Sequence, residues 1–199
     1  MPSTLQIDTI KDASASNTLF EQSGSDWAWG SAPPAGTILQ VVSVTNSDAE
    51  SSTSNSFVDI TGFSVAITPS SSSNYFFLNA MVNGGQATST ASYFLRLYIS
   101  GGGTDGAILI NSNPSSRTAS TAGGETPGST TGVTYNHGLS GRIRLSDSIP
   151  DWSSGPLTAK VQWSSSGSNT IRLNRTGDNS DSSGKGAASS TLTIFEIKG

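Results

Sequence analysis

The stretch Tyr93-Phe-Leu-Arg-Leu-Tyr-Ile99 decides the fold class of this 199-residue chain. An extended strand turns alternate side chains to opposite faces. Four apolar side chains of the stretch therefore share one face: Tyr93, Leu95, Leu97 and Ile99. The opposite face carries Phe94, Arg96 and Tyr98. A two-residue period of this kind predicts a half-buried β-strand.

The same period recurs along the chain. Two further sets of alternating residues are predicted to point inward: Phe63, Val65 and Ile67, and Leu157, Ala159, Val161 and Trp163. Strands are expected at 37–44, 57–61, 63–68, 75–82, 93–99, 107–110, 141–145, 157–164, 170–174 and 191–197. The first of these is apolar on both faces near its start, which predicts a central strand or a subunit interface.

Composition agrees with this pattern. Serine and threonine make up about three residues in ten, glycine occurs 22 times and only 12% of the residues are charged, which is unlike helical proteins. Many short strands separated by turn residues indicate an all-β antiparallel sandwich or jelly roll.

Several function classes are disfavoured by residue counts. The chain has no cysteine and one histidine, which excludes thiol chemistry and zinc sites built from several Cys or His ligands. A net charge of −4 with scattered basic residues predicts no nucleic-acid partner. The start Met1-Pro2-Ser3 lacks a signal peptide and no apolar run is long enough for a membrane span. We therefore expect cytoplasmic synthesis and no membrane insertion.

The first 36 residues differ from the remainder. Residues 3–22 have too few large apolar side chains to bury a core, so they are expected to form an extended attachment arm. The stretch 23–36 contains Gly, Pro33-Pro34 and two tryptophans, which predicts an irregular linker. We place the boundary between the arm with its linker (1–36) and the β-domain (37–199) here. Candidate attachment residues are Leu5, Ile7, Ile10, Leu19, Phe20, Trp27 and Trp29. The two tryptophans are expected to pack on a neighbouring subunit or particle, the alternative being a sugar-stacking platform.

Residues 111–136 are rich in Gly, Ser, Thr and Pro and almost free of hydrophobic residues. A stretch of that length is too long for a simple turn and is therefore expected to be an exposed functional loop. Candidate contact residues in and beside it are Asn113, Arg117, Glu125, Tyr135 and His137.

Catalysis is not expected, and neither a cofactor nor a metal site is predicted. His137 stands in a turn-like context without a Gly-x-Ser-x-Gly elbow and is interpreted as a surface or interface histidine. Asp147 and Asp151 beside Trp152 form the best carboxylate cluster, yet Asp is a common turn residue. The run Asp178-Asn-Ser-Asp181 lacks the order of a dedicated calcium loop and is interpreted as a solvated turn.

Two parts of the sequence resemble known proteins. The stretch TLQIDTIKDASASNTLFEQ at 4–22 resembles the start of tail-fibre and other virion-surface proteins of marine tailed phages, where L-x-[VI]-D-T-[IL] recurs. The strands after Thr37 resemble the trimeric jelly roll of tumour-necrosis-factor-like domains and phage fibre heads. The ending from Ile171, including GKGAASSTLTIFEIKG, resembles a recurrent ending of phage fibre domains.

The resemblance implies a homotrimer with its last strand near the three-fold axis and variable loops at the far end. It leads us to expect a phage virion structural protein, a fibre-type adhesion module attached to other virion proteins by its arm. Its outer contact would be a host surface glycan or protein, made through the loop at 111–136. The alternative is a capsid decoration or cement protein that stabilises the head shell, and a cytosolic hydrolase is the remaining, disfavoured class.

Overall fold

The structure is a computed structural model. It describes residues 7, 9–11, 14, 18–23, 26–29, 33–87, 92–110, 115–125, 134–144, 146, 152 and 154–199. The first three strands are β1 (Thr9–Lys11), β2 (Thr18–Ser23) and β3 (Asp26–Trp29). The others are β4 (Ile38–Asn46), β5 (Glu50–Ser52), β6 (Val58–Ile67), β7 (Tyr75–Gln86), β8 (Ser92–Gly101), β9 (Thr104–Ile108), β10 (Ala122–Glu125), β11 (Tyr135–Arg144), β12 (Leu157–Ser165), β13 (Ile171–Leu173) and β14 (Ser190–Ile197). A short 3-10 turn, Ser166–Ser168, follows β12.

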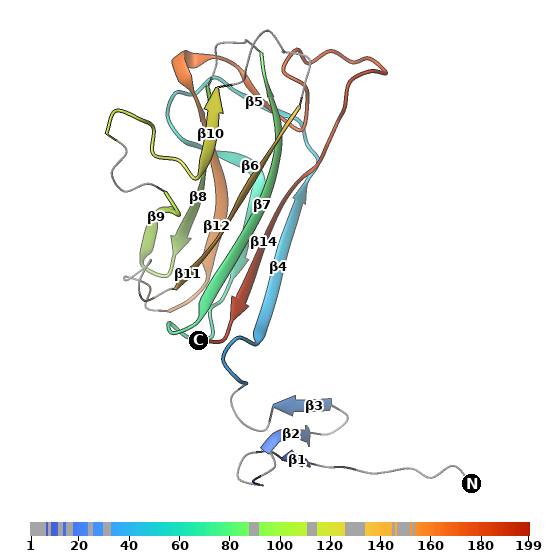
Figure 1. Ribbon diagram of the computed structural model, residues 1–199, viewed down its shortest axis with the longest axis vertical. Coiled ribbons are helices and arrows are strands. Elements are labelled where there is room, and N and C mark those ends of the chain that lie inside the picture. Colours follow the sequence, from blue (N-terminus) through green and yellow to red (C-terminus); the bar gives the residue numbers. More distant parts are fainter. Residues whose placement is uncertain are drawn as a thin grey trace, which may run out of the picture.

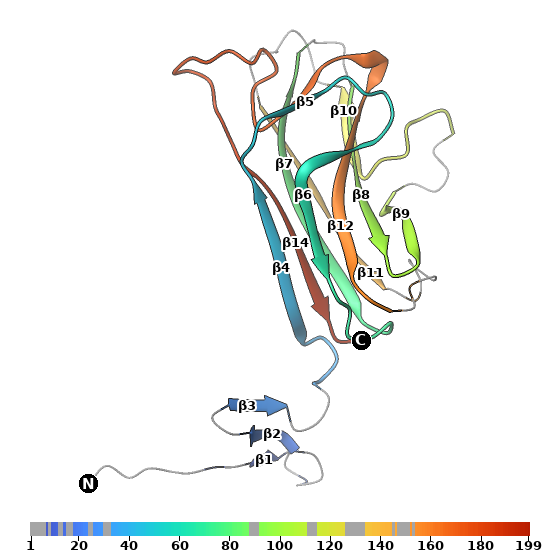
Figure 2. The same cartoon turned by 180° about the vertical axis from the view of Figure 1, so that it is seen from behind.

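Two antiparallel sheets pack face to face (Figures 1 and 2). The first has the order β4-β14-β7, with β11 on the other edge of β7 and β13-β5 continuing the sheet beyond the start of β14. The second has the order β6-β12-β8, with β9 and β10 both paired to β8. Because the chain passes repeatedly from one sheet to the other, the order β4-β14-β7-β11 against β6-β12-β8-β9 is that of a jelly roll. The predicted fold class is confirmed.

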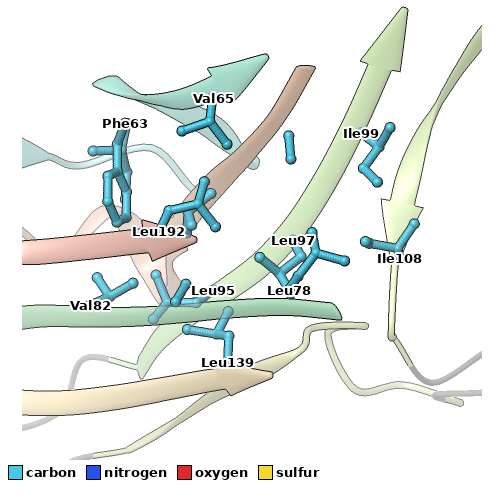
Figure 3. Close-up of a cluster of buried hydrophobic side chains, with 14 of the residues drawn as sticks. Phe63, Val65, Leu78, Val82, Leu95, Leu97, Ile99, Ile108, Leu139 and Leu192 are labelled. Atoms are coloured by element: carbon cyan, nitrogen blue, oxygen red, sulfur yellow. The ribbon is translucent and has the colours of Figure 1, made fainter. Parts of the chain in front are cut away.

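The core lies between these sheets, and Figure 3 shows its central side chains. Every residue predicted to point inward from 63–67, 93–99 and 157–163 is buried. Facing them from the first sheet are Phe76, Leu78, Ala80, Val82, Leu139, Ile143, Leu192 and Ile194. Burying a large aliphatic or aromatic side chain contributes about 1.5–3 kcal/mol. The alternating pattern therefore selects which face of each strand turns inward.

The strand boundaries differ from the predicted ones in several places, of which three are instructive. The runs 57–61 and 63–68 form one strand, β6, that passes through Gly62 with φ 67°. The strand expected at 141–145 begins six residues earlier, at Tyr135. Within the linker 23–36, which was expected to be irregular, Asp26–Trp29 forms β3 and pairs with β2. Hydrogen-bonded pairing with a neighbouring strand outweighs weak local propensity in each region.

The arm is a small sheet rather than a wholly extended segment. β1, β2 and β3 form an antiparallel three-stranded sheet that lies beyond the start of β4 (Figure 1). Its register places Phe20 opposite Trp29 and Gln22 opposite Trp27. The arm was predicted to be extended because it lacks a core. Antiparallel pairing of its three strands orders it instead.

A buried carboxylate closes the end of the sandwich nearest the arm. Glu196 is fully buried and accepts hydrogen bonds from the Ser70 backbone N–H and Oγ, Asn74 Nδ2 and Gln40 Nε2 at 2.5–2.8 Å. Burial alone would raise the pKa of Glu196, but these donors, led by Gln40, outweigh it and lower the pKa. The charged side chain thus fixes the turn between β6 and β7 to the last strand.

Candidate functional surfaces

The arm carries the residues predicted to attach the chain. Ile7 and Ile10 are 41% and 42% exposed, and Phe20 in β2 is half-buried. Leu19, Trp27 and Trp29 have their backbones in β2 and β3, while Leu5 lies outside the described residues. The exposed Ile7 and Ile10 leave apolar surface in water that burial against another surface would stabilise. The arm therefore suits docking on another surface.

The outer face of the first sheet is apolar near the arm. The register aligns Val41, Phe195 and Phe77 across β4, β14 and β7. Val41 is 50% exposed, and the rings of Phe77 and Phe195 lie 6.0 Å apart. Ile38, 55% exposed, and Tyr75 extend the patch. The guanidinium carbons of Arg142 and Arg144 lie 4.4 and 5.0 Å from the Tyr75 ring centroid. We call this surface the apolar face: Ile38, Val41, Tyr75, Phe77, Phe195 and Ile197.

The outer face of the second sheet carries Phe94 and Tyr98 together with polar groups, and Arg96 and Lys160 lie over the Tyr98 ring. Lys160 pairs with Asp59 at 2.8 Å, and Gln162 Nε2 donates to the other Asp59 oxygen at 2.6 Å. Arg96 donates from Nε to Gln162 at 2.7 Å and lies 4.2 Å from the ring centroid of Phe57. These polar groups are hydrogen-bond and ion-pair partners for one another at the surface. The first sheet therefore presents an outer face that contact with another protein would stabilise.

The predicted contact stretch 111–136 is not one free loop. Residues 122–125 form β10 and pair with β8, and Tyr135 already belongs to β11. Thr121 Oγ1 accepts a hydrogen bond from Leu97 N at 3.1 Å and donates one to the Ile108 carbonyl at 3.3 Å. The described part, residues 115–121, lies beside the second sheet (Figure 1). We call 115–121 the flank loop.

The five candidate contact residues are spread over different settings. Arg117 is exposed in the flank loop, whereas Asn113 lies outside the described residues. Glu125 has its backbone in β10, and Tyr135 is half-buried at the start of β11. His137 was predicted to lie on the surface or at an interface. It is half-buried on β11 and stacks on Tyr93 with ring centroids 5.0 Å apart. The expectation that residues 111–136 form one exposed loop is therefore wrong.

A second Gly/Ser-rich loop stands at the end of the sandwich away from the arm (Figures 1 and 2). We call residues 174–188, between β13 and β14, the crest loop. Ala188 N donates to the Asn174 carbonyl at 3.3 Å, so its ends are close together, as in an Ω-loop. A Cβ at Gly177 would overlap the Gln86 carbonyl, so only glycine allows the loop to lie this close to β7.

Asn174 anchors the crest loop to the sandwich. Its side chain is buried and donates to the carbonyls of Asn46 and Asp48 at 2.8 and 2.9 Å. Its amide oxygen accepts a hydrogen bond from Ser190 Oγ at 2.7 Å. Asn174 has φ 58°, a conformation that asparagine tolerates better than most residues. These bonds join the end of β4, the end of β13 and the start of β14.

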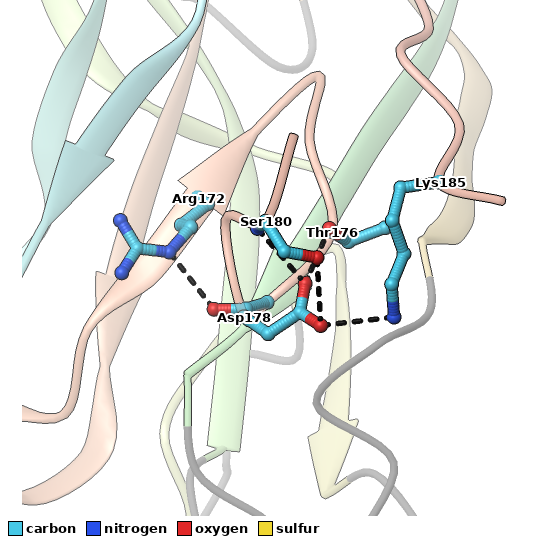
Figure 4. Close-up of polar contacts among 6 residues, drawn as sticks. Arg172, Thr176, Asp178, Ser180 and Lys185 are labelled. Atoms are coloured by element: carbon cyan, nitrogen blue, oxygen red, sulfur yellow. Dashed lines mark hydrogen bonds and ion pairs between the residues drawn. The ribbon is translucent and has the colours of Figure 1, made fainter. Parts of the chain in front are cut away.

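Asp178 organises the interior of the crest loop, as Figure 4 shows. Its carboxylate pairs with Lys185 Nζ at 2.9 Å and accepts hydrogen bonds from Thr176 Oγ1 at 2.7 Å and Ser180 Oγ at 3.2 Å. The Lys185 ammonium, with the Thr176 hydroxyl and the Ser180 amide, holds the pKa of Asp178 well below its usual range. The run 178–181 is thus a structured turn in which a lysine neutralises the first carboxylate.

Of the candidate catalytic groups, the structure describes His137. Burial lowers the pKa of His137, and its ring packs on Tyr93 rather than on a nucleophile. Trp152 donates from Nε1 to the Gly155 carbonyl at 3.2 Å, while Asp147 and Asp151 lie outside the described residues. Among the residues that the structure describes, no group of three His, Cys, Asp or Glu side chains could hold a metal ion. In the same part of the chain, no helix has the length and apolarity needed to cross a membrane.

Sequence reasoning missed the two arginines that flank Asn174. Arg172 donates from Nε to the Gly177 carbonyl at 2.9 Å, and Arg175 donates from Nη1 to Asn179 Oδ1 at 3.2 Å. The signal was present as Arg-Leu-Asn-Arg before a Gly/Asp/Ser loop, but composition alone did not separate it from other turns.

No protein-family model matches the chain, and no curated protein matches it. Solved structures with similarity include that of infectious bursal disease virus, Gx strain, at 13% identity and a TM-score of 0.43, covering 100% of this chain and 48% of that one. Another is the VP2 subviral particle of infectious bursal disease virus, at 14% identity and a TM-score of 0.40, covering 89% and 41%. The chain spans less than half the length of these two proteins. Similarity of this extent carries no conclusion about function.

Proposed function

We propose that the chain is a virion structural protein, a homotrimeric fibre-type adhesion module attached to a phage particle by its N-terminal arm. The observation that carries this proposal is the apolar face. Val41, Phe195 and Phe77 form an apolar row on the outside of a sheet whose inner side already fills the core. Contiguous exposed apolar patches of this kind are typical of protein interfaces.

The occupant that suits the apolar face is a second and third copy of the same chain. The resemblance to tumour-necrosis-factor-like trimers implies that the last strand lies near the three-fold axis. β14 is that strand, and its Phe195 lies in the middle of the apolar row, between Val41 and Phe77. Closed symmetric assembly would bury all three copies of the face at once.

The arm supports attachment to other virion proteins. It joins the sandwich through the segment before β4 and carries exposed Ile7 and Ile10. The crest loop lies at the opposite end (Figure 2). A module held at one end by its arm would therefore present the crest to the outside.

Light scattering on the full chain tests the trimer. We expect a mass three times the 20.4 kDa of the monomer. Val41→Glu should dissociate the trimer because it places three charges in the buried interface. Ala66, exposed on β6 of the other sheet between the buried Val65 and Ile67, provides the control, and Ala66→Glu should leave the trimer intact. A wild-type monomer at micromolar concentration would contradict the assembly.

Imaging of labelled virions tests the role. A fibre module predicts a small number of trimers on the tail. A capsid decoration protein, the competing candidate, would use the same arm and the same trimer but predicts many copies on the head. Virions without the protein should lose host adhesion if the first proposal holds, and should lose shell stability if the second does.

A further inference from the structure

Two adjoining hollows lie at the crest. The first, of about 170 Å³, is lined by Arg175, Thr176, Asn179, Ser180, Asp181, Ser182, Lys185, Gly186 and Ala187. The second, of about 190 Å³, is lined by Ala49, Glu50, Ser51, Arg172, Arg175 and Asn179. Arg175 and Asn179 border both, so the two hollows form one polar groove across the crest loop and the edge of β5 and β13.

The cations of this groove are not equivalent. Lys185 is neutralised by Asp178. Arg172 and Arg175 each make one hydrogen bond through the guanidinium, to Gly177 and Asn179, and neither is in an ion pair with a described residue. A guanidinium has five N–H donors in a fixed fork. Both arginines therefore have donors available on the second hollow.

The acidic side chain of the second hollow is already engaged. Glu50 accepts hydrogen bonds from the Thr61 backbone N–H at 2.9 Å and from Thr61 Oγ1 at 3.2 Å. Two guanidinium groups and one occupied carboxylate leave this hollow with an excess of one positive charge. It suits a carboxylate, whose two oxygens match the fork of donors on either guanidinium.

The first hollow has the chemistry of a hydroxyl-binding site. Ser180, Ser182 and Asn179 offer both donors and acceptors, and Asp181 offers acceptors. Apart from Ala187 its lining has no apolar side chain, which disfavours an apolar ligand. Pockets for drug-sized ligands are about 300–1,000 Å³, so each of these smaller hollows admits no more than one sugar ring.

We propose that the groove binds an acidic glycan, with a uronic-acid carboxylate held by Arg172 and Arg175 and the neighbouring ring hydroxyls held beyond Asn179. This site rests on the proposed adhesion function and gives it a ligand class. Individual contacts of this kind are weak, but three copies on one trimer would act together. The anchoring of the crest loop by Asn174 and Asp178 preorganises the groove, which limits the entropy lost on binding.

Calorimetric titration of the full chain with a trigalacturonate tests the site, with maltotriose as the neutral trisaccharide and inorganic phosphate as the competing anion. We expect trigalacturonate alone to bind, and the affinity to fall as salt is raised. Arg175→Ala should weaken binding about tenfold or more, since hydrogen bonds to charged groups are lost. Arg175→Lys should also weaken it, because an ammonium cannot replace the fork.

Arg117→Ala is the matched control, because Arg117 is an exposed arginine of the flank loop. Its affinity for trigalacturonate should equal that of the wild type. Equal binding of maltotriose, tighter binding of phosphate, no binding of trigalacturonate, or unchanged binding by Arg175→Ala with an unaltered melting temperature would each overturn the site.

The site and the adhesion role fail differently. If trigalacturonate does not bind but virions lacking the protein lose adhesion, the site is wrong and the role stands. If trigalacturonate binds through Arg175 but virions lacking the protein adhere normally, the role is wrong and the acidic-sugar site stands.

Discussion

The crest loop and the stretch 111–136 have similar compositions and different structures. Both are rich in Gly and Ser with few hydrophobic residues. In the stretch 111–136, the described residues next to the flank loop join the second sheet as β10. The crest loop stays outside the sheets, closes on itself and is organised by Asp178 and Asn174.

The difference lies in where the backbone N–H and C=O groups of each segment find hydrogen-bond partners. In the stretch 111–136, a neighbouring strand with a free edge supplies the partners, so residues 122–125 become a strand despite low propensity. In the crest loop, the Asp178 carboxylate bonds the Ser180 backbone and nearby hydroxyl groups locally, which competes with strand formation. Composition predicts that a segment lacks a core of its own. It does not show whether the segment pairs as a strand or forms a loop held by side-chain hydrogen bonds.

The largest expected effect is at Asn174, whose replacement should release the crest loop from the sandwich. Asn174→Ala leaves the carbonyls of Asn46 and Asp48 without their donor and places alanine at φ 58°. Unsatisfied buried groups cost about 1–3 kcal/mol each, and the left-handed conformation adds about 1–2 kcal/mol. We expect the free energy of unfolding to fall by about 3–5 kcal/mol in urea denaturation.

Asn179 supplies the control for that measurement. It also has a positive φ, 54°, but it is exposed and accepts a single hydrogen bond, from Arg175. Asn179→Ala should therefore lose much less stability, about 1 kcal/mol from the backbone conformation. Equal losses at the two positions would show that backbone conformation, and not the buried side-chain bonds, holds the crest loop.

The sequence predicted the sandwich well because burial alternates with the strand period. Leu157, Ala159, Val161 and Trp163 could be placed inward from spacing alone. Pairing partners could not be predicted from the same pattern. Whether Gly123 lies in a loop or a strand depends on the edge of β8, which is remote in sequence.

The candidate surfaces were predicted less well for a related reason. Arg172 and Arg175 line a common hollow because Asn174 turns the chain through a positive φ and Gly177 lies against β7. Both conditions are long-range, since Asn174 bonds residues more than a hundred positions away. A single sequence reveals the residue types but not this convergence. The apolar face, in contrast, was partly predictable, because the strand after Thr37 is apolar on both sides.

A smaller effect is expected at Thr121, which tests whether the flank loop is fixed to the sandwich. Thr121→Val removes the acceptor for Leu97 N and the donor to the Ile108 carbonyl. We expect a loss of about 1–2 kcal/mol in the free energy of unfolding and faster amide exchange at Leu97. Thr118→Val is the control, since Thr118 is exposed, and it should stay within about 0.5 kcal/mol of the wild type. A neutral Thr121→Val would show that the Thr121 hydroxyl does not fix the flank loop to the sandwich.

The smallest effect is confined to the crest loop and concerns the titration of Asp178. The folded-state pKa of Asp178 lies below its ordinary value of about 3.9, chiefly because of the Lys185 ammonium. The order that this carboxylate gives the loop is therefore fully present above that ordinary value and is lost only as the pH falls through the lower folded-state pKa. Followed by NMR, the Ser180 amide, which donates to Asp178 at 3.3 Å, should begin to shift only in stronger acid than an ordinary aspartate requires. In the Asp178→Asn variant this pH-dependent shift of the Ser180 amide should disappear. The amides of residues 117–119, a segment without a carboxylate of its own, serve as the reference in both proteins. A Ser180 titration centred at the ordinary aspartate value would mean that Lys185 does not hold the carboxylate in solution, and the crest loop would then be no better organised than its composition suggests.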